Sequence, residues 1–171
     1  IFAIMILFYR GMGIASSLAL TIYAAIMIVL LALVPWVELT LPGIAGIILS
    51  IGMAVVANVI IFARIREEIA AGISVRTGLK TGFEKALSAI IDGNITTLIA
   101  AAVLWGLGPG TVKGFAQTLT LGIVLSMFTA LVVTKLILYA FYGLGFRDAK
   151  WYGVAKERKS IDFLGKKKWF F

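Results

Sequence analysis

The fold is decided by residues 42–63, which read PGIAGIILSIGMAVVANVIIFA and contain no charged side chain. A helix over this stretch would be about 33 Å long, enough to cross the roughly 30 Å hydrocarbon core of a bilayer. The apolar residues are continuous instead of alternating, which argues against a strand of a transmembrane barrel. The stretch predicts a membrane-spanning helix, and Pro42 suits its first turn, where a missing N–H has no cost.

The composition of the whole chain has the same character. Of its 171 residues, 61% are hydrophobic and only 14% are charged, with a mean hydropathy of +1.06. A soluble domain is about half apolar and a quarter charged, and a disordered chain is more polar still, so both classes are excluded. The absence of Cys and His removes disulfides, thiol catalysis and the commonest metal ligands. We therefore expect neither a cofactor nor an enzymatic activity.

Four further apolar runs accompany the first, at residues 1–9, 14–37, 86–106 and 114–142. The run 1–9 would span only about 13 Å as a helix, so we expect it to be part of a spanning helix in a longer protein. The other three are each long enough to span. Burial inside a soluble protein is an alternative for a single run but not for all of them. The sequence predicts an all-α polytopic transmembrane bundle over 1–142, followed by a basic tail over 143–171.

The connection over residues 64–85 is polar but patterned. Isoleucines recur every four residues at 65, 69 and 73, and large apolar residues do so at 79, 83 and 87. This spacing places each set on one helical face. We predict one or two short amphipathic helices that lie on the membrane surface; a solvated loop is the alternative.

The basic residues give the orientation. If the helices alternate in direction, fifteen of the sixteen Lys and Arg residues fall on one side of the membrane, and only Lys113 falls on the other. By the positive-inside rule, the connection 64–85 and the tail are expected to be cytoplasmic. Attraction to anionic membrane lipid accounts for the net charge of +8 more simply than a nucleic-acid partner, which we do not expect.

Asp92 is the one acid of eight that falls inside a predicted span. Ser88, Asp92 and Thr96 recur every four residues and so share a helical face, with Asn94 and Thr97 close by. An intramembrane acid with hydroxyl and amide neighbours can hold and pass on a proton or an ion. An inert polar cluster between packed helices is the alternative. Asn58 lies in the middle of another span, where its amide needs a partner on a neighbouring helix.

Three stripes of small residues recur at four-residue spacing and predict close helix packing in lipid. They comprise Gly46, Ser50, Ala54 and Asn58; Ala89, Gly93, Thr97 and Ala101; and Thr118, Gly122, Ser126 and Ala130.

Several strings resemble a known family. They are LPGIAG at 41–46, GMAVVANVIIFARIREE at 52–68, DGNITTLIA at 92–100, KGFA at 113–116 and SMFTA at 126–130. Together they resemble the C-terminal membrane half of SecD, a family of protein-export subunits related to the resistance–nodulation–division transporters. The resemblance implies the second to sixth helices of a SecD-type half, with a first helix and a large extracytoplasmic domain before Ile1. Residues 160–171 resemble the lead-in to the first helix of SecF, which indicates a fused SecD–SecF chain.

The resemblance also implies a function. Members of the family lie in the bacterial cell membrane and assist the SecYEG translocon late in preprotein export. They act beside a SecF-type half, with a YidC-type insertase as a further partner. They use a proton or sodium gradient. Two alternatives stay open: a small-molecule or lipid exporter of the same superfamily, and a scaffold subunit that is not coupled to a gradient.

One position departs from the family pattern. The coupling residue is usually an Asp two residues before the Asn of the GMAVDAN string, and this chain has Val56 there while retaining Asn58. Valine cannot carry a proton. The coupling acid is then supplied by the SecF half, or Asp92 suffices, or a degenerate or engineered change at Val56 leaves the protein uncoupled. We expect Asn58, Asp92, Thr96 and Thr97 to face the interface between the two halves.

Overall fold

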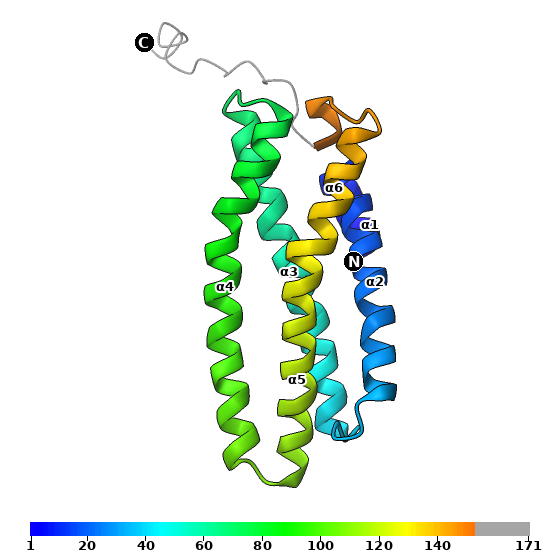
Figure 1. Ribbon diagram of the computed structural model, residues 1–171, viewed down its shortest axis with the longest axis vertical. Coiled ribbons are helices and arrows are strands. Elements are labelled where there is room, and N and C mark those ends of the chain that lie inside the picture. Colours follow the sequence, from blue (N-terminus) through cyan, green and yellow to red (C-terminus); the bar gives the residue numbers. More distant parts are fainter. Residues whose placement is uncertain (153–171) are drawn as a thin grey trace, which may run out of the picture.

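The computed structural model describes residues 1–152, and within that range it contains helices and turns but no strand. The helices are α1 (Phe2–Tyr9), α2 (Gly11–Leu33), α3 (Leu41–Ala70), α4 (Val75–Leu107), α5 (Gly110–Phe128), the π-helical turn η1 (Thr129–Val133), α6 (Thr134–Gly143) and the 3₁₀ turn η2 (Ala149–Tyr152). Four helices are long and apolar enough to cross a membrane: α2, α3, α4 and the continuous rod from Gly110 to Gly143. Figure 1 shows them packed lengthwise in one bundle. The predicted all-α membrane fold is confirmed.

The first run is helical and ends at Arg10. The chain breaks there, where φ is 48°, so that α1 ends and α2 begins at once. Gly13 of α2 lies directly against the backbone of Met5 in α1, in a place where a Cβ atom would not fit. The helix α1 thus packs closely against the start of α2. The helix α2 begins before residue 14 and ends before residue 37, ahead of Pro35.

The connection 64–85 corrects a prediction. It does not form separate amphipathic helices, because α3 continues to Ala70 and α4 begins at Val75, leaving only a short turn between them. Glycines at 78 and 82 of α4 lie against Ile69 and Ile65 of α3, too close for any larger residue. The apolar period that suggested a membrane-facing surface instead joins the two helices. At 30 residues, α3 is about 45 Å long and so exceeds the hydrocarbon core.

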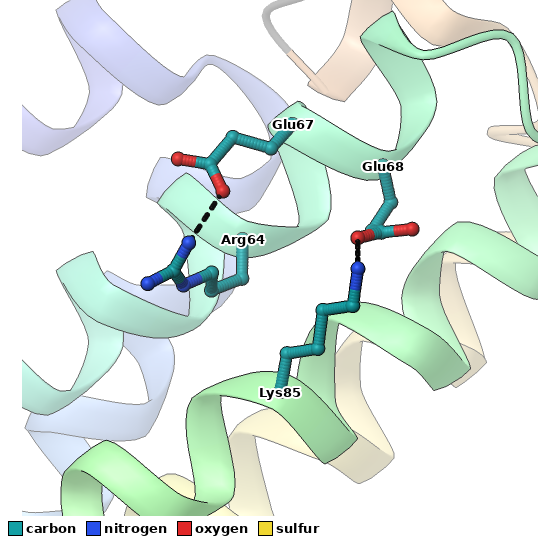
Figure 2. A network of polar contacts seen from close by, with 4 residues as sticks. All are labelled: Arg64, Glu67, Glu68 and Lys85. Atoms are coloured by element: carbon teal, nitrogen blue, oxygen red, sulfur yellow. Dashed lines mark hydrogen bonds and ion pairs between the residues drawn. The ribbon is translucent and has the colours of Figure 1, made fainter.

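One ion pair joins the extended ends of these two helices, and a second lies beside it (Figure 2). Lys85 of α4 donates to the nearly buried carboxylate of Glu68 in α3. Beside it, the exposed residues Arg64 and Glu67 pair within α3 at 2.8 Å. The turn between the helices contains Gly72 at a φ of 91°, and Ser74 caps α4 by accepting a hydrogen bond from the N–H of Thr77. We call this end of the bundle, which also holds Arg10 and the end of α6, the basic end.

Two of the three small-residue stripes pack on each other and confirm that prediction. Along the contact between α3 and α5, Gly46 lies against Thr118, and Gly122 lies against Ser50, with no space for a Cβ atom at either glycine. Hydrogen bonds accompany this close approach. Thr118 Oγ1 donates to the Gly43 carbonyl at 2.8 Å, and the Tyr23 hydroxyl of α2 donates to Ser50 Oγ at 2.9 Å. The α3–α5 contact is therefore the polar, tightly packed centre of the bundle.

The third stripe, on α4, lies differently. Ala101 is fully buried, but Ala89 and Gly93 are exposed, and a Cβ added at Gly93 would meet nothing within 4 Å. Within residues 1–152, this part of the stripe packs against no other helix.

A π-helical turn interrupts the last rod. The N–H of Thr134 bonds to the carbonyl of Thr129, five residues earlier, and the Oγ1 of Thr134 contacts the same carbonyl at 3.3 Å. Such single turns insert one residue into an α-helix and are frequent at functional sites. Here the turn orients Thr134 toward α3.

Candidate coupling site between α3 and α4

A shallow groove of about 140 Å³ lies between α3 and α4 in the middle of the bundle. Val56, which is 56% exposed, forms part of its wall. The other residues that line it are Met53, Ala57, Ile60, Ala89, Ile90, Gly93 and Asn94. The groove is thus apolar except for one amide, and it is where an acid at position 56 would stand.

Asn58 faces the opposite way from Val56. Two residues along an α-helix correspond to a rotation of about 200°, so the two side chains leave α3 on nearly opposite sides. Asn58 is 1% exposed, and its Oδ1 accepts a hydrogen bond of 2.9 Å from Thr134 Oγ1. The amide of Asn58 therefore joins two helices of this chain, whereas Val56 faces outward.

The helix α4 repeats this arrangement. Asp92 is exposed, whereas Asn94 is buried and turns toward the groove. Thr96 donates to the Asp92 carbonyl at 2.8 Å, and Thr97 donates to the Gly93 carbonyl at 3.0 Å, so both hydroxyls are satisfied by their own helix. Ser88, Asp92 and Thr96 share one exposed face of α4, as the spacing predicted.

Asn94 is incompletely bonded. Its Nδ2 donates to the Ile90 carbonyl at 2.7 Å, but its Oδ1 is buried without a partner. An unpaired acceptor in an apolar environment costs free energy. A donor that enters the groove would remove this cost.

The four residues predicted to face the partner half do not come together. Asp92 and Thr96 lie on the outer face of α4, Thr97 is partly buried beside them, and Asn58 points into the bundle. Sequence reasoning named Asn94 only as a neighbour of Asp92, not as a residue of the groove, and it missed Thr134. Each is a polar residue in an apolar run, and that signal, applied to Asn58, could also have identified them.

The chemistry of the groove is limited by its residues. None of the eight residues that line it is acidic or basic, so the groove cannot by itself bind and release a proton. Among residues 1–152, no group of three acidic side chains could hold a metal ion.

The fold and the groove define a class, namely polytopic α-helical membrane proteins with a polar position between two spanning helices. The sequence profile described as "Protein export membrane protein SecD/SecF, C-terminal" matches residues 1–143. The chain belongs to this SecD/SecF family of protein-export membrane proteins.

Individual relatives agree. The chain is 49% identical over 169 residues to the protein translocase subunit SecD of Acidaminococcus fermentans, an alignment that covers 96% of this chain and 40% of that protein. It is 48% identical over 138 residues to SecD of Pseudomonas aeruginosa, covering 81% of this chain and 22% of the other. The crystal structure of SecDF, a translocon-associated membrane protein from Thermus thermophilus, matches with a TM-score of 0.79 and 38% identity over 84% of this chain and 20% of that chain. The chain thus spans less than half the length of these relatives.

Proposed function

We propose that this chain is the membrane-embedded part of a SecD-type subunit that assists the SecYEG translocon in the late stage of preprotein export. Membership of the family supports this function. The observation that bears most directly on its mechanism is Val56, which lies exposed in the α3–α4 groove where the family resemblance places the coupling acid. Preprotein export by this subunit is driven by a proton or sodium gradient. The acid that couples export to the gradient is not at position 56, where this chain has valine.

A SecF-type half is the proposed partner of the face that carries the groove. Small residues lie uncovered on both helices there: a Cβ added at Gly52 of α3 or at Gly93 of α4 would meet nothing within 4 Å. Such surfaces permit close approach of another helix in lipid. The unpaired Oδ1 of Asn94 would accept a hydrogen bond from that helix. The coupling acid is then contributed by the partner half or by Asp92. A YidC-type insertase would bind elsewhere.

An uncoupled scaffold is the second candidate, and Val56 is the observation that favours it. In that case, the chain positions its partner at the translocon, and the gradient does no work through this half.

Preprotein export in cells depleted of their own SecD and SecF tests the proposal. The full-length protein is compared with its Val56→Asp, Asp92→Asn and Val124→Asp forms, with and without a collapsed gradient. Val124 is exposed on α5, away from the groove, and controls for a new acid in the membrane. Gradient-dependent export by the unchanged protein that is lost in Asp92→Asn assigns coupling to Asp92. Export that becomes gradient-dependent only in Val56→Asp identifies the natural chain as uncoupled.

Equal export by every form, with no response to the gradient, supports the scaffold. Co-purification with SecYEG separates both readings from an exporter of small molecules or lipids, which would not bind the translocon.

A further inference from the structure

A second cavity lies at the basic end of the bundle, distant from the groove. It has a volume of about 180 Å³ and is almost wholly apolar. Its aliphatic wall comes from Gly11 and Ile14 of α2 and Leu138 of α6, and its aromatic wall from Phe141, Phe146, Trp151 and Tyr152. An engineered apolar cavity of about 150 Å³ is known to bind benzene, so this pocket has room for a segment of hydrocarbon chain.

The aromatic wall is held in place by its own contacts. The ring of Phe146 packs edge-on against Phe141, with centroids 5.7 Å apart, and against Trp151, with centroids 4.6 Å apart. The Tyr152 hydroxyl donates to the Phe146 carbonyl at 3.1 Å. Gly11 lies under the Trp151 carbonyl, where a Cβ would be only 2.9 Å from the oxygen. The turn η2 is therefore fastened over the end of the bundle and forms one side of the pocket.

Basic residues accompany this apolar surface. Arg10 directly precedes Gly11, Arg147 directly follows Phe146, and Lys150 directly precedes Trp151; all three are exposed. Each cation is thus one residue from a residue that lines the pocket. The guanidinium of Arg147 lies 5.3 Å from the ring centroid of Tyr142, which holds it at this end of α6.

We infer that this pocket binds an anionic phospholipid, with an acyl chain against the aromatic wall and the phosphate near Arg10, Arg147 and Lys150. With the four long helices spanning a bilayer, the basic end would lie toward the headgroup region, and half-exposed Trp151 is of the type that settles there. A basic residue near a membrane surface contributes about 1 kcal/mol toward anionic lipid, or about fivefold in affinity. Charge and hydrocarbon together select this ligand over a zwitterionic lipid.

Contact quenching of Trp151 by brominated lipid tests the inference. The full chain carries Trp36→Phe, Trp105→Phe and Trp169→Phe, so that Trp151 is the only indole, and it is reconstituted in phosphatidylcholine vesicles. A small fraction of the lipid is then replaced by phosphatidylglycerol or phosphatidylcholine with brominated acyl chains. We expect phosphatidylglycerol to quench at a mole fraction at least about fivefold lower.

Two variants address the two parts of the site. The first variant combines Arg10→Gln, Arg147→Gln and Lys150→Gln and should reduce the preference for phosphatidylglycerol over phosphatidylcholine to about one. Its control combines Arg64→Gln, Arg76→Gln and Lys80→Gln and removes equal charge at the same end. The control should leave the lipid preference unchanged. Ile14→Phe, which narrows the pocket from an exposed position, should weaken quenching by both lipids.

Equal quenching by the two lipids overturns the inference, and so does a preference that survives loss of the three flanking cations. Absence of quenching by either lipid shows that the pocket is closed to lipid and also overturns the inference. If the single-tryptophan form does not fold, phosphatidylglycerol with a photoactivatable acyl chain is applied to the unchanged protein. Labelling is then expected within residues 11–14 or 138–152, and labelling elsewhere alone contradicts the assignment.

Discussion

Thr134 Oγ1 donates a hydrogen bond of 2.9 Å to Asn58 Oδ1, and the two residues lie 76 positions apart in the chain. Both are almost fully buried. The bond exists because the π-helical turn Thr129–Val133 orients Thr134 toward α3. The bond therefore links Asn58, in the string that resembles the coupling motif, to the π-helical turn that precedes Thr134.

Loss of this bond should destabilise the bundle. Thr134→Val keeps the side-chain shape and should lower the free energy of unfolding by about 1 kcal/mol, since the Asn58 acceptor is left unpaired. A double-mutant cycle with Asn58→Ala should give a coupling of about 0.6–1.7 kcal/mol, the range for hydrogen bonds between membrane helices. Unfolding in mixed micelles, followed by circular dichroism, measures both. Thr120→Val is the control, because Thr120 bonds only within its own helix; an equal effect there would contradict the assignment.

Close packing between α3 and α5 should make Gly122 intolerant of substitution. Gly122→Ala places a Cβ on the side chain of Ser50 and should cost about 1–3 kcal/mol, as overpacking does. Gly52→Ala is the matched control, since its Cβ would meet nothing within 4 Å; it should be neutral, or stabilising by up to about 1 kcal/mol from helix propensity. The same unfolding measurement applies. Similar losses of unfolding free energy in Gly122→Ala and Gly52→Ala would show that backbone effects, and not close packing, cause the destabilisation.

The ion pair of Glu68 with Lys85 should stabilise the end of the α3–α4 hairpin (Figure 2). Because the Lys85 side chain is more than half exposed, Lys85→Met should cost no more than about 1 kcal/mol. Amide hydrogen exchange around the turn 71–74 should accelerate up to about fivefold. Arg64→Met removes an exposed pair within one helix and should change exchange less. Faster amide exchange in Arg64→Met than in Lys85→Met would contradict the prediction that the Glu68–Lys85 pair stabilises this end more.

The phenol of Tyr152 should lose its proton at a higher pH than an exposed tyrosine does. Burial raises the pKa of its phenol to about 12, with a smaller contribution from the nearby phenol of Tyr142. Since the folded pKa lies above the ordinary value of 10, the folded state keeps the proton longer. The stability that this phenol contributes is complete below pH 10 and is lost as the pH rises from 10 through 12.

Absorbance at 295 nm against pH, compared with the Tyr152→Phe variant, isolates this titration. A difference curve with its midpoint near pH 10 would contradict the burial of Tyr152 under the turn η2. A midpoint near 12 supports it.

Much of the fold was predictable because lipid imposes simple rules. The apolar runs predicted the spanning helices, and the four-residue spacing of Gly46, Ser50, Thr118 and Gly122 predicted close helix packing but not which two helices would pair. The connection 64–85 was misjudged because one periodic pattern suits either a membrane surface or a second helix. The glycines at 78 and 82, which admit Ile69 and Ile65, were the clue to the hairpin.

The candidate site was predicted less completely. Asp92 and Thr96 share a face because they are one turn apart, which spacing alone establishes. Asn58 was assigned to the same surface as Asp92, although they lie on different helices whose relative rotation no local pattern specifies. The π-helical turn could not be foreseen, since residues 129–133 read TALVV and contain no helix breaker.

The π-helical turn changes the helical register within the rod from Gly110 to Gly143. One extra residue is accommodated between Thr129 and Val133, so everything after it is rotated by about 100° relative to an uninterrupted α-helix. Deleting one residue among positions 130–133 should therefore restore a regular helix, because the bond from the Thr134 N–H to the Thr129 carbonyl then closes an ordinary α-helical turn. Thr134 and the buried Leu138 should keep their neighbours in that variant. The same one-residue deletion elsewhere in the rod would instead rotate every residue after it by about 100° and shift the end of α6 by about 1.5 Å.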